Sequence, residues 1–225
     1  MVLISLVAVR FGIAAAPQDV EQLLANDPGP MAGAVDMIER RCHSVVTYED
    51  TRWRSDQVED LPGAIGPSVP KMPAGRPFMF SVSREIGWQG TKGVGRALND
   101  ALDAYERTNE AGAFRVALDA PMFHVYPATG APLDAAISIP AGTRSLDETI
   151  RFIRAAVAAS TRARINLGTV PTNFMLQARI TLEATSDPAR RALARALVST
   201  GTALSWRLLF DFRDDAYYLN IHLVR

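Results

Sequence analysis

The pattern of apolar and polar positions is clearest in the second half of the chain. Short runs with apolar residues at every second position predict strands, and longer runs with apolar residues three or four positions apart predict helices. Their order is β-α-β-β-α-β-β. The expected strands cover 136–140, 164–168, 178–184, 204–210 and 217–223, and the expected helices cover 145–160 and 187–200.

Local signals at the ends of these two helices support the assignment. Ser145 followed by Glu148 forms a capping box, in which each side chain bonds the backbone N–H of the other residue. Gly201 suits the position just after a helix, where the backbone often turns left-handed. The second helix also carries Leu193 and Leu197 at helical spacing, so we expect both to be buried.

The first half repeats most of this order, as α-β-β-α-β-β. The segment Arg96–Leu102 (RALNDAL) also mirrors Arg191–Leu197 (RALARAL). We therefore predict an α+β protein of tandem β-α-β-β-α-β-β modules, 17–127 and 133–225, with two helices sandwiched between small sheets in each. Two unrelated α+β units are the alternative. The expected elements of the first half are helices at 30–41 and 93–107 and strands at 44–48, 77–83, 114–118 and 122–126, with 17–27 in the place of a first strand.

A long connection, 54–76, separates two expected strands of the first half. It is rich in proline and glycine, and a connection of this length is usually functional or disordered. Trp53 and Trp88 flank it. Aromatic residues are enriched at protein interfaces, so both tryptophans are candidate contact residues, with packing in the core as the alternative.

The last strand shows the sharpest alternation. Tyr217, Leu219, Ile221 and Leu223 fall on one face, and the other face carries Tyr218, Asn220 and His222. One face can therefore pack on helices while the other stays accessible. We predict that this strand is an open edge that binds a partner strand, with Tyr218, Asn220 and His222 as contact residues. The alternative is a strand inside its sheet.

The first sixteen residues, 1–16, are apolar and end in alanines, and a polar stretch follows them. This outline predicts a secretory signal peptide and therefore a periplasmic or secreted protein. A buried first strand or helix is the alternative. No apolar run after this segment is long enough to predict a transmembrane span.

Charge and composition narrow the classes of partner and of chemistry. Lys+Arg and Asp+Glu balance at 24 each, so the chain lacks the broad positive field that non-specific nucleic-acid binding needs. Proteins, peptides and small molecules are the partners left. Cys42 is the one cysteine, and the histidines at 43, 124 and 222 are scattered, so we expect no metal site and no cofactor.

No catalytic motif emerges either. The glycine-rich segment 87–95 lacks both the Gly-Lys-Ser/Thr of a phosphate-binding loop and the Gly-x-Gly-x-x-Gly of a dinucleotide site. No Gly-x-Ser-x-Gly elbow occurs. We therefore expect no catalytic residues and no enzymatic activity. An enzyme with an unrecognised site between the modules is the alternative.

The order of elements in the second half resembles the short N-terminal domain of secretins and TonB-dependent receptors. The resemblance implies two helices between two small sheets, a location in the envelope of a diderm bacterium, and contact with other proteins. We expect a standalone relative of these domains, because no pore or barrel segment follows before Arg225. The matching features are the strand 137–140 ending in Pro140, the helix 145–156, the strands 164–167 and 180–184, the helix start 187–190 and the exit Thr200-Gly201-Thr202.

Together these observations predict a non-catalytic periplasmic protein-interaction module. The expected partner is an envelope protein or peptide. A small-ligand or peptide receptor domain is the second possibility that the sequence leaves open.

Overall fold

The computed structural model describes residues 20–27, 29–60, 71–73, 75–83, 91–109 and 113–224. Three sequence predictions fall on residues outside these ranges. They are the signal peptide at 1–16, the contact role of Trp88 and, within the long connection 54–76, the residues 61–70 and 74.

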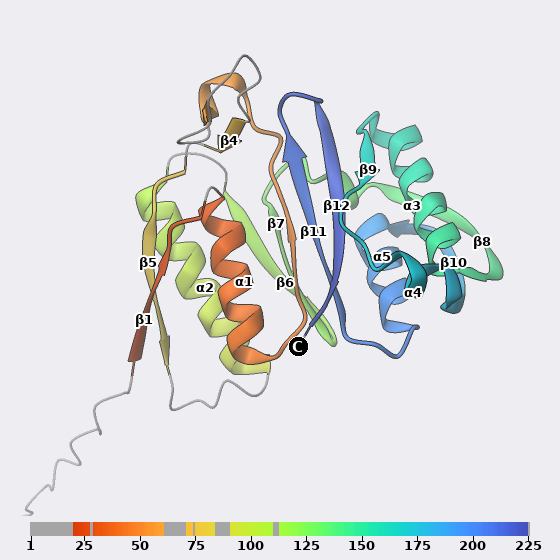
Figure 1. The fold of residues 1–225 in the computed structure, drawn as a ribbon, viewed down its shortest axis with the longest axis horizontal. Coiled ribbons are helices and arrows are strands. Elements are labelled where there is room, and N and C mark those ends of the chain that lie inside the picture. The colour runs from red at the N-terminus through yellow and green to blue at the C-terminus, as the bar shows by residue number, and fades with distance from the viewer. Residues whose placement is uncertain are drawn as a thin grey trace, which may run out of the picture.

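A mixed six-stranded sheet runs through the middle of the molecule, in the order β6-β7-β2-β11-β12-β9 (Figure 1). The pairs β6–β7 and β11–β12 are antiparallel hairpins, whereas β7–β2, β2–β11 and β12–β9 are parallel. The first three strands of this order come from the first half of the chain and the other three from the second half. Their bounds are β2 Val46–Glu49, β6 Phe114–Asp119, β7 Met122–Pro127, β9 Ile165–Leu167, β11 Leu204–Asp211 and β12 Ala216–Leu223.

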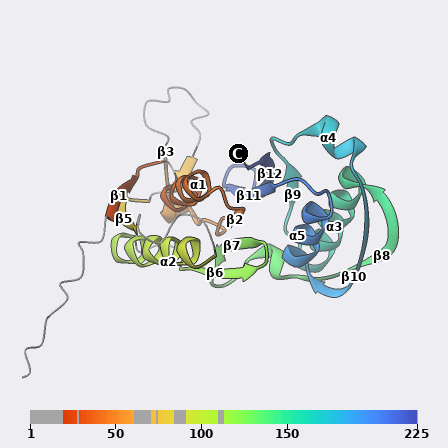
Figure 2. The same cartoon turned by 90° about the horizontal axis from the view of Figure 1, so that it is seen from below.

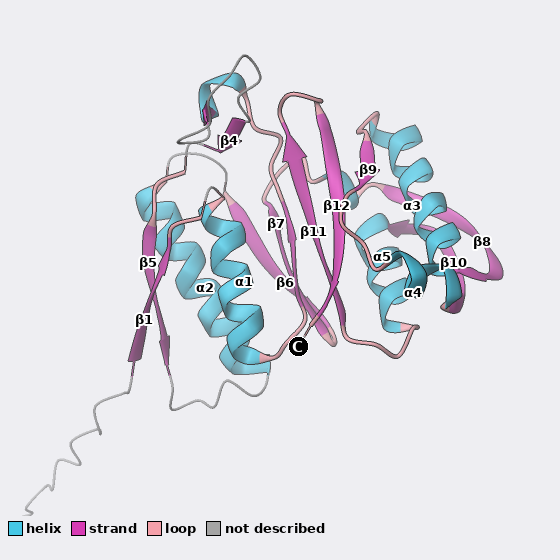
Figure 3. Cartoon of the chain, viewed as in Figure 1, coloured by secondary structure: helices cyan, strands magenta, loops and turns pink. Residues whose placement is uncertain are grey.

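Each half adds a helix pair and a two-stranded sheet to this central sheet (Figures 1 and 3). In the first half, two helices lie between the central sheet and an antiparallel pair of strands. In the second half, two helices likewise lie between the central sheet and a second, longer pair of antiparallel strands. The elements of the first half are β1 Val20–Ala25, α1 Pro30–Cys42, β5 Phe78–Ser83 and α2 Thr91–Thr108. Those of the second half are β8 Ala136–Ser145, α3 Leu146–Thr161, β10 Arg179–Pro188 and α5 Ala189–Val198.

Shorter elements complete the described chain. They are the 3₁₀ turns Ser55–Gln57 and Pro132–Asp134, the paired strands β3 Val58–Asp60 and β4 Lys71–Pro73, and the helix α4 Thr172–Gln177. Seen from below, α1 and α2 gather at one end of the molecule and α3, α4 and α5 at the other (Figure 2).

Each half has an apolar core of its own. The first joins α1 and α2 to Val46 and Tyr48 of β2, and the second joins α3 and α5 to Trp206 and Leu208 of β11. Tyr48 is the register partner of Arg207, so these two side chains share one face of the sheet while Trp206 and Leu208 lie on the other. The helix pairs therefore cover opposite faces, and the Arg207 face of β11 and β12 borders α1.

Most of the predicted elements are confirmed within a few residues, as is the α+β class. Ser145 and Glu148 form the expected capping box, with the Ser145 hydroxyl accepting from the Glu148 N–H at 3.1 Å. Leu193 and Leu197 are both fully buried, and Gly201 has the left-handed φ of 70° that follows a helix.

Other boundaries were wrong. The strands expected at 136–140 and 178–184 continue to Ser145 and Pro188, because they pair with each other along this whole length. Between the expected strands 164–168 and 178–184, where no element was predicted, lies the six-residue helix α4, which is too short to show a helical period.

The open-edge interpretation of the last strand is also wrong. β12 pairs with β11 on one side and with β9 on the other, so its backbone groups are already bonded within the sheet. Nor does each half keep two sheets of its own, since β2 and β11 join three strands from each half in one sheet. Both errors have one cause: parallel pairing between strands that lie far apart in the sequence leaves no local pattern.

The packing of α5 generates a stability prediction. Leu193→Ala should lower the free energy of unfolding by about 2–5 kcal/mol, because Leu193 is fully buried in the second core. The matched control is Leu176→Ala, whose side chain on α4 is 53% exposed and should cost less than about 0.5 kcal/mol. Urea unfolding measures both, and equal losses would show that α5 does not present this face to the core.

Candidate functional site

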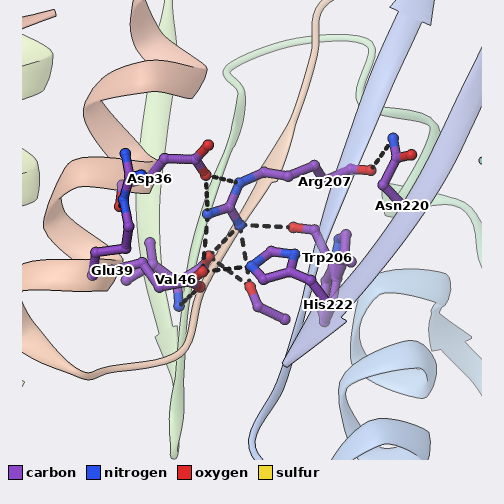
Figure 4. A network of polar contacts seen from close by, with 9 residues as sticks. Asp36, Glu39, Val46, Trp206, Arg207, Asn220 and His222 are labelled. Carbon is purple, nitrogen blue, oxygen red and sulfur yellow. Dashed lines mark hydrogen bonds and ion pairs between the residues drawn. The ribbon is translucent and has the colours of Figure 1, made fainter. Parts of the chain in front are cut away.

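A groove runs between α1 and the face of β11 and β12 that α3 and α5 leave free. Its volume is about 310 Å³. The first half supplies one wall through α1, and the second half supplies the other through two strands (Figure 4). The lining residues are Asp36, Glu39, Arg40, Arg207, His222, Leu223 and Val224.

Spacing along the elements explains why these side chains meet. Asp36, Glu39 and Arg40 lie three and four positions apart, so they share one side of α1. On the strands, Arg207 faces the first half through its register with Tyr48, and alternation turns His222 away from the buried face of β12. Pairing β2 with β11 then brings the helix wall against the strand wall.

The buried guanidinium of Arg207 is the centre of the groove (Figure 4). Its Nε donates to Asp36 Oδ1 at 2.7 Å, and Nη2 lies 3.2 Å from Glu39 Oε1. Its Nη1 donates to the backbone oxygens of Val46 and Trp206, at 2.6 and 3.0 Å. Removing a cation from water is costly unless it is paired and hydrogen-bonded, and Arg207 meets both conditions with groups from α1, β2 and β11.

Glu39 is the buried anion that complements this cation. Its Oε2 accepts the backbone N–H of Val46 at 3.0 Å, and its Oε1 lies 2.5 Å from His222 Nε2. Burial favours the neutral acid, but the hydrogen bond from His222 and the charge of Arg207 outweigh it and hold the pKa of Glu39 below its ordinary value. The carboxylate is therefore ionised at neutral pH and fixed in place on both oxygens.

Asn220 and Tyr218 extend the same face of β12 beyond the groove. The Asn220 side chain accepts the backbone N–H of Thr169 at 2.8 Å and so ties β12 to the end of β9. Gly168 makes room for it, because a Cβ there would lie 2.3 Å from Asn220 Oδ1. The Tyr218 hydroxyl donates to the Asp214 carboxylate. Asn220 thus bonds to a neighbouring strand end within the protein, and Tyr218, Asn220 and His222 are all partly exposed.

A second buried ion pair crosses between the halves on the opposite face of the sheet. Arg190 of α5 donates to Glu49 of β2 at 2.5 Å and to Asp134 at 2.6 Å, and its guanidinium lies 3.7 Å from the ring centre of Tyr126. Burial raises the pKa of Glu49 despite Arg190. Burial lowers the pKa of the neighbouring His124 to about 4, so this imidazole is neutral at pH 7.

Asp50 continues the contact between the halves past the end of β2. Its backbone N–H donates to Leu208 O at 2.7 Å, and its carboxylate accepts from the Tyr48 hydroxyl at 2.7 Å and the Phe210 N–H at 3.1 Å. Burial raises the pKa of Asp50 to about 6, although these hydrogen bonds favour the anion. Polar contacts therefore join the halves along the whole length of the β2–β11 pairing.

The structure brings together three of the five residues proposed from the sequence. Tyr218, Asn220 and His222 lie on one face of β12, as their alternation predicted, while Tyr217, Leu219 and Ile221 are at most 4% exposed on the other. Leu223, expected on the buried face, is 51% exposed because it is the last residue of the strand, and it lines the groove. Trp53 is only 5% exposed, which favours the alternative of a core residue. The sequence interpretation missed four charged residues of the groove: Asp36, Glu39, Arg40 and Arg207. On α1 the acids look like a solvated helix face, and nothing local marks Arg207 as buried.

No family model, curated protein or solved structure matches this chain. The resemblance to the secretin and TonB-receptor short domain therefore stays a prediction. Among the helices that the structure describes, none is both long and apolar enough to cross a membrane.

The ion pair generates a prediction with a pH signature. Glu39→Gln should lower the free energy of unfolding at pH 7 by about 3–5 kcal/mol, because it leaves Arg207 buried without its most enclosed partner. Because the folded pKa of Glu39 lies below 4.5, the stabilisation is fully present above that value and is lost as the pH falls through the folded pKa. Urea unfolding should therefore show the difference from the unaltered protein shrinking in acid.

Asp36→Asn is the control, since it removes the other carboxylate on Arg207. The Asp36 side chain is 48% exposed, so water replaces much of what the substitution removes and the loss should be about 1 kcal/mol. Equal losses for the two variants, or a Glu39→Gln effect that does not change with pH, would contradict the assignment of Glu39 as the buried counter-ion.

Proposed function

We propose that this protein is a non-catalytic protein-interaction module of the bacterial envelope, exported by a leader at 1–16 and built from two related modules, 17–127 and 133–225. Its partner is an envelope protein or peptide. The observation that carries the proposal is the alternation of β12, which buries one row of side chains and leaves Tyr218 and His222 partly open beside the groove.

The pairing pattern supports a relation between the halves. In each half, the strand after the first helix pairs in parallel with the second strand of the closing hairpin, β2 with β7 and β9 with β12. In each half, too, the strand before the first helix pairs antiparallel with the strand before the second helix. The first helices both end on a left-handed residue, His43 and Arg162, three positions before the next strand. For one module, the resemblance to the short domain implies the order β-α-β-β-α-β-β and two helices between two small sheets.

The chemistry of the free face suits a protein surface. Leu209 is 37% exposed and is the register partner of Tyr218, so an apolar and an aromatic side chain lie side by side. Tyrosine with a polar surround is typical of the residues that dominate binding energy at interfaces. Both belong to rigid strands, which lowers the entropy lost on binding.

The bonding in the groove supports binding over turnover. Both oxygens of Glu39 accept hydrogen bonds within the protein, and the guanidinium of Arg207 is held by two carboxylates and by backbone oxygens. A general acid or base has to exchange a proton with a substrate at such an atom. Glu39 and Arg207 already bond to groups of the protein, so they are better suited to stabilising the shape of a binding surface.

Site-specific photocrosslinking tests this proposal. Replacing Tyr218 with a benzophenone amino acid in the native host should give, on illumination, a discrete adduct with one envelope protein, because this side chain lies on the proposed contact face. The same probe at Phe152 is the control, since Phe152 is 47% exposed but belongs to α3. The adduct should form at 218 and not at 152.

Two results would contradict the proposal. Equal adducts from positions 218 and 152 would show non-specific proximity, and the absence of any adduct at 218 would exclude this face as a contact surface. Circular dichroism of both purified variants shows beforehand that each is folded. A proline at Asn220 would not be informative, because β12 is bonded on both sides and would unfold.

A further inference from the structure

A second hollow lies at the end of the sheet where β11 turns into β12. Its volume is about 450 Å³, within the range of small-molecule sites. The C-terminal end of α3, the β11–β12 turn and the segment 130–132 surround it. It opens beside Tyr217, which alternation places on the opposite face of β12 from Tyr218. This hollow is therefore distinct from the groove beside α1.

The walls of the hollow are apolar and partly aromatic. Phe210 and Tyr217 contribute neighbouring rings whose centres lie 5.0 Å apart. Ala131, Pro132 and Ala163 complete the apolar lining. Such walls favour a flat or branched apolar group over a fully hydrated ion.

The rim of the hollow is cationic. Arg52, Arg162 and Arg164 all line it, against one carboxylate, that of Asp215. Arg52 is bidentate on Asp215, with two contacts of 2.7 Å. Within the described residues, the guanidinium groups of Arg162 and Arg164 have neither an ion pair nor a side-chain hydrogen bond.

The charge balance leaves about two positive charges around an apolar cavity. The last carbonyls of α3 offset roughly half a charge, since a helix C-terminus carries a partial negative charge. The carboxylates of Asp50 and Glu49 also act on Tyr217, so the excess of positive charge belongs to the arginines of the rim and not to the whole cavity. Two arginines can bind the oxygens of one carboxylate or phosphate, which is the geometry that guanidinium groups favour.

Arg162 ends α3 with a φ of 62°, a left-handed conformation in which glycine or asparagine is usual. His43 ends α1 in the same way, so this backbone belongs to the pattern that the two halves share. It places Arg162 and Arg164 at the rim of the hollow, where both line it.

We propose that this hollow binds a small molecule that carries a carboxylate or phosphate on an aromatic or branched apolar body. The anion lies between Arg162 and Arg164, and the apolar body packs on Phe210 and Tyr217. The proposal is independent of the contact face on β12, because the two sites lie on opposite faces of that strand.

Titration with phenyl phosphate, followed by NMR, tests the site directly. We expect saturable shifts of the Ala131 and Ala163 signals, with half-saturation below about 5 mM for a ligand of this size. Benzyl alcohol keeps the ring without the charge, and inorganic phosphate keeps the charge without the ring. Both should bind at least about tenfold more weakly, because benzyl alcohol cannot pair with the arginines and inorganic phosphate cannot pack on the aromatic rings.

Paired substitutions locate the binding. Arg162→Gln with Arg164→Gln should weaken phenyl phosphate binding by at least about tenfold, since charge-assisted hydrogen bonds are lost. Arg96→Gln with Arg107→Gln removes the same charge from exposed positions of α2 and should leave binding unchanged. Melting curves of both double variants show that each is folded before titration.

Four results would overturn the proposal. The first three are no saturation by phenyl phosphate, equal weakening by the two pairs of substitutions, and equal affinity for inorganic phosphate. A capped peptide of alternating Asp and Phe that binds at the same signals about tenfold more tightly than phenyl phosphate would assign the hollow to a protein segment and would also overturn it.

Discussion

The buried guanidinium of Arg207 is the constraint on which the relation between the two halves depends. It belongs to β11, yet its partners are Asp36 and Glu39 of α1 and the Val46 carbonyl of β2. A buried cation without these partners would cost several kcal/mol. The halves can therefore keep Arg207 buried only while α1, β2 and β11 stay in this register. Hydrogen bonds and ion pairs are directional, so the bonds of Arg207 fix one position of the first half against the second. Apolar packing alone would allow several such positions.

The parallel pairing of β2 with β11 also determines where the accessible surfaces lie. It places the helix pairs on opposite faces of one sheet, so each pair leaves part of the sheet uncovered beyond its own half. The groove beside α1 and the polar face of β12 occupy one such region. The hollow near Tyr217 lies past the end of α3 on the other face. Both candidate binding surfaces thus follow from how the halves join.

The local elements could be predicted from the sequence because they rest on local physics. The capping box at Ser145, the buried face of α5 and the alternation of β12 each depend on neighbours within a few positions. The position of β12 inside the sheet could not be predicted in the same way, since β9 reaches it across some fifty residues of chain. The role of Glu39 was hidden for the same reason. In the sequence it is one acid beside two arginines, and only the approach of Val46, Arg207 and His222 makes it a buried counter-ion.

The most direct test of this account is native-state hydrogen exchange at the junction of the halves. The Asp50 N–H donates to Leu208 O across the β2–β11 pairing, and the amides of Leu98 and Ile153 report on the helices of the two cores. If the Arg207 network makes the halves one cooperative unit, all three amides should exchange with the same free energy of opening, that of global unfolding. Exchange of Asp50 through an opening that costs several kcal/mol less, while Leu98 and Ile153 stay protected, would show two modules that fold independently and meet only loosely.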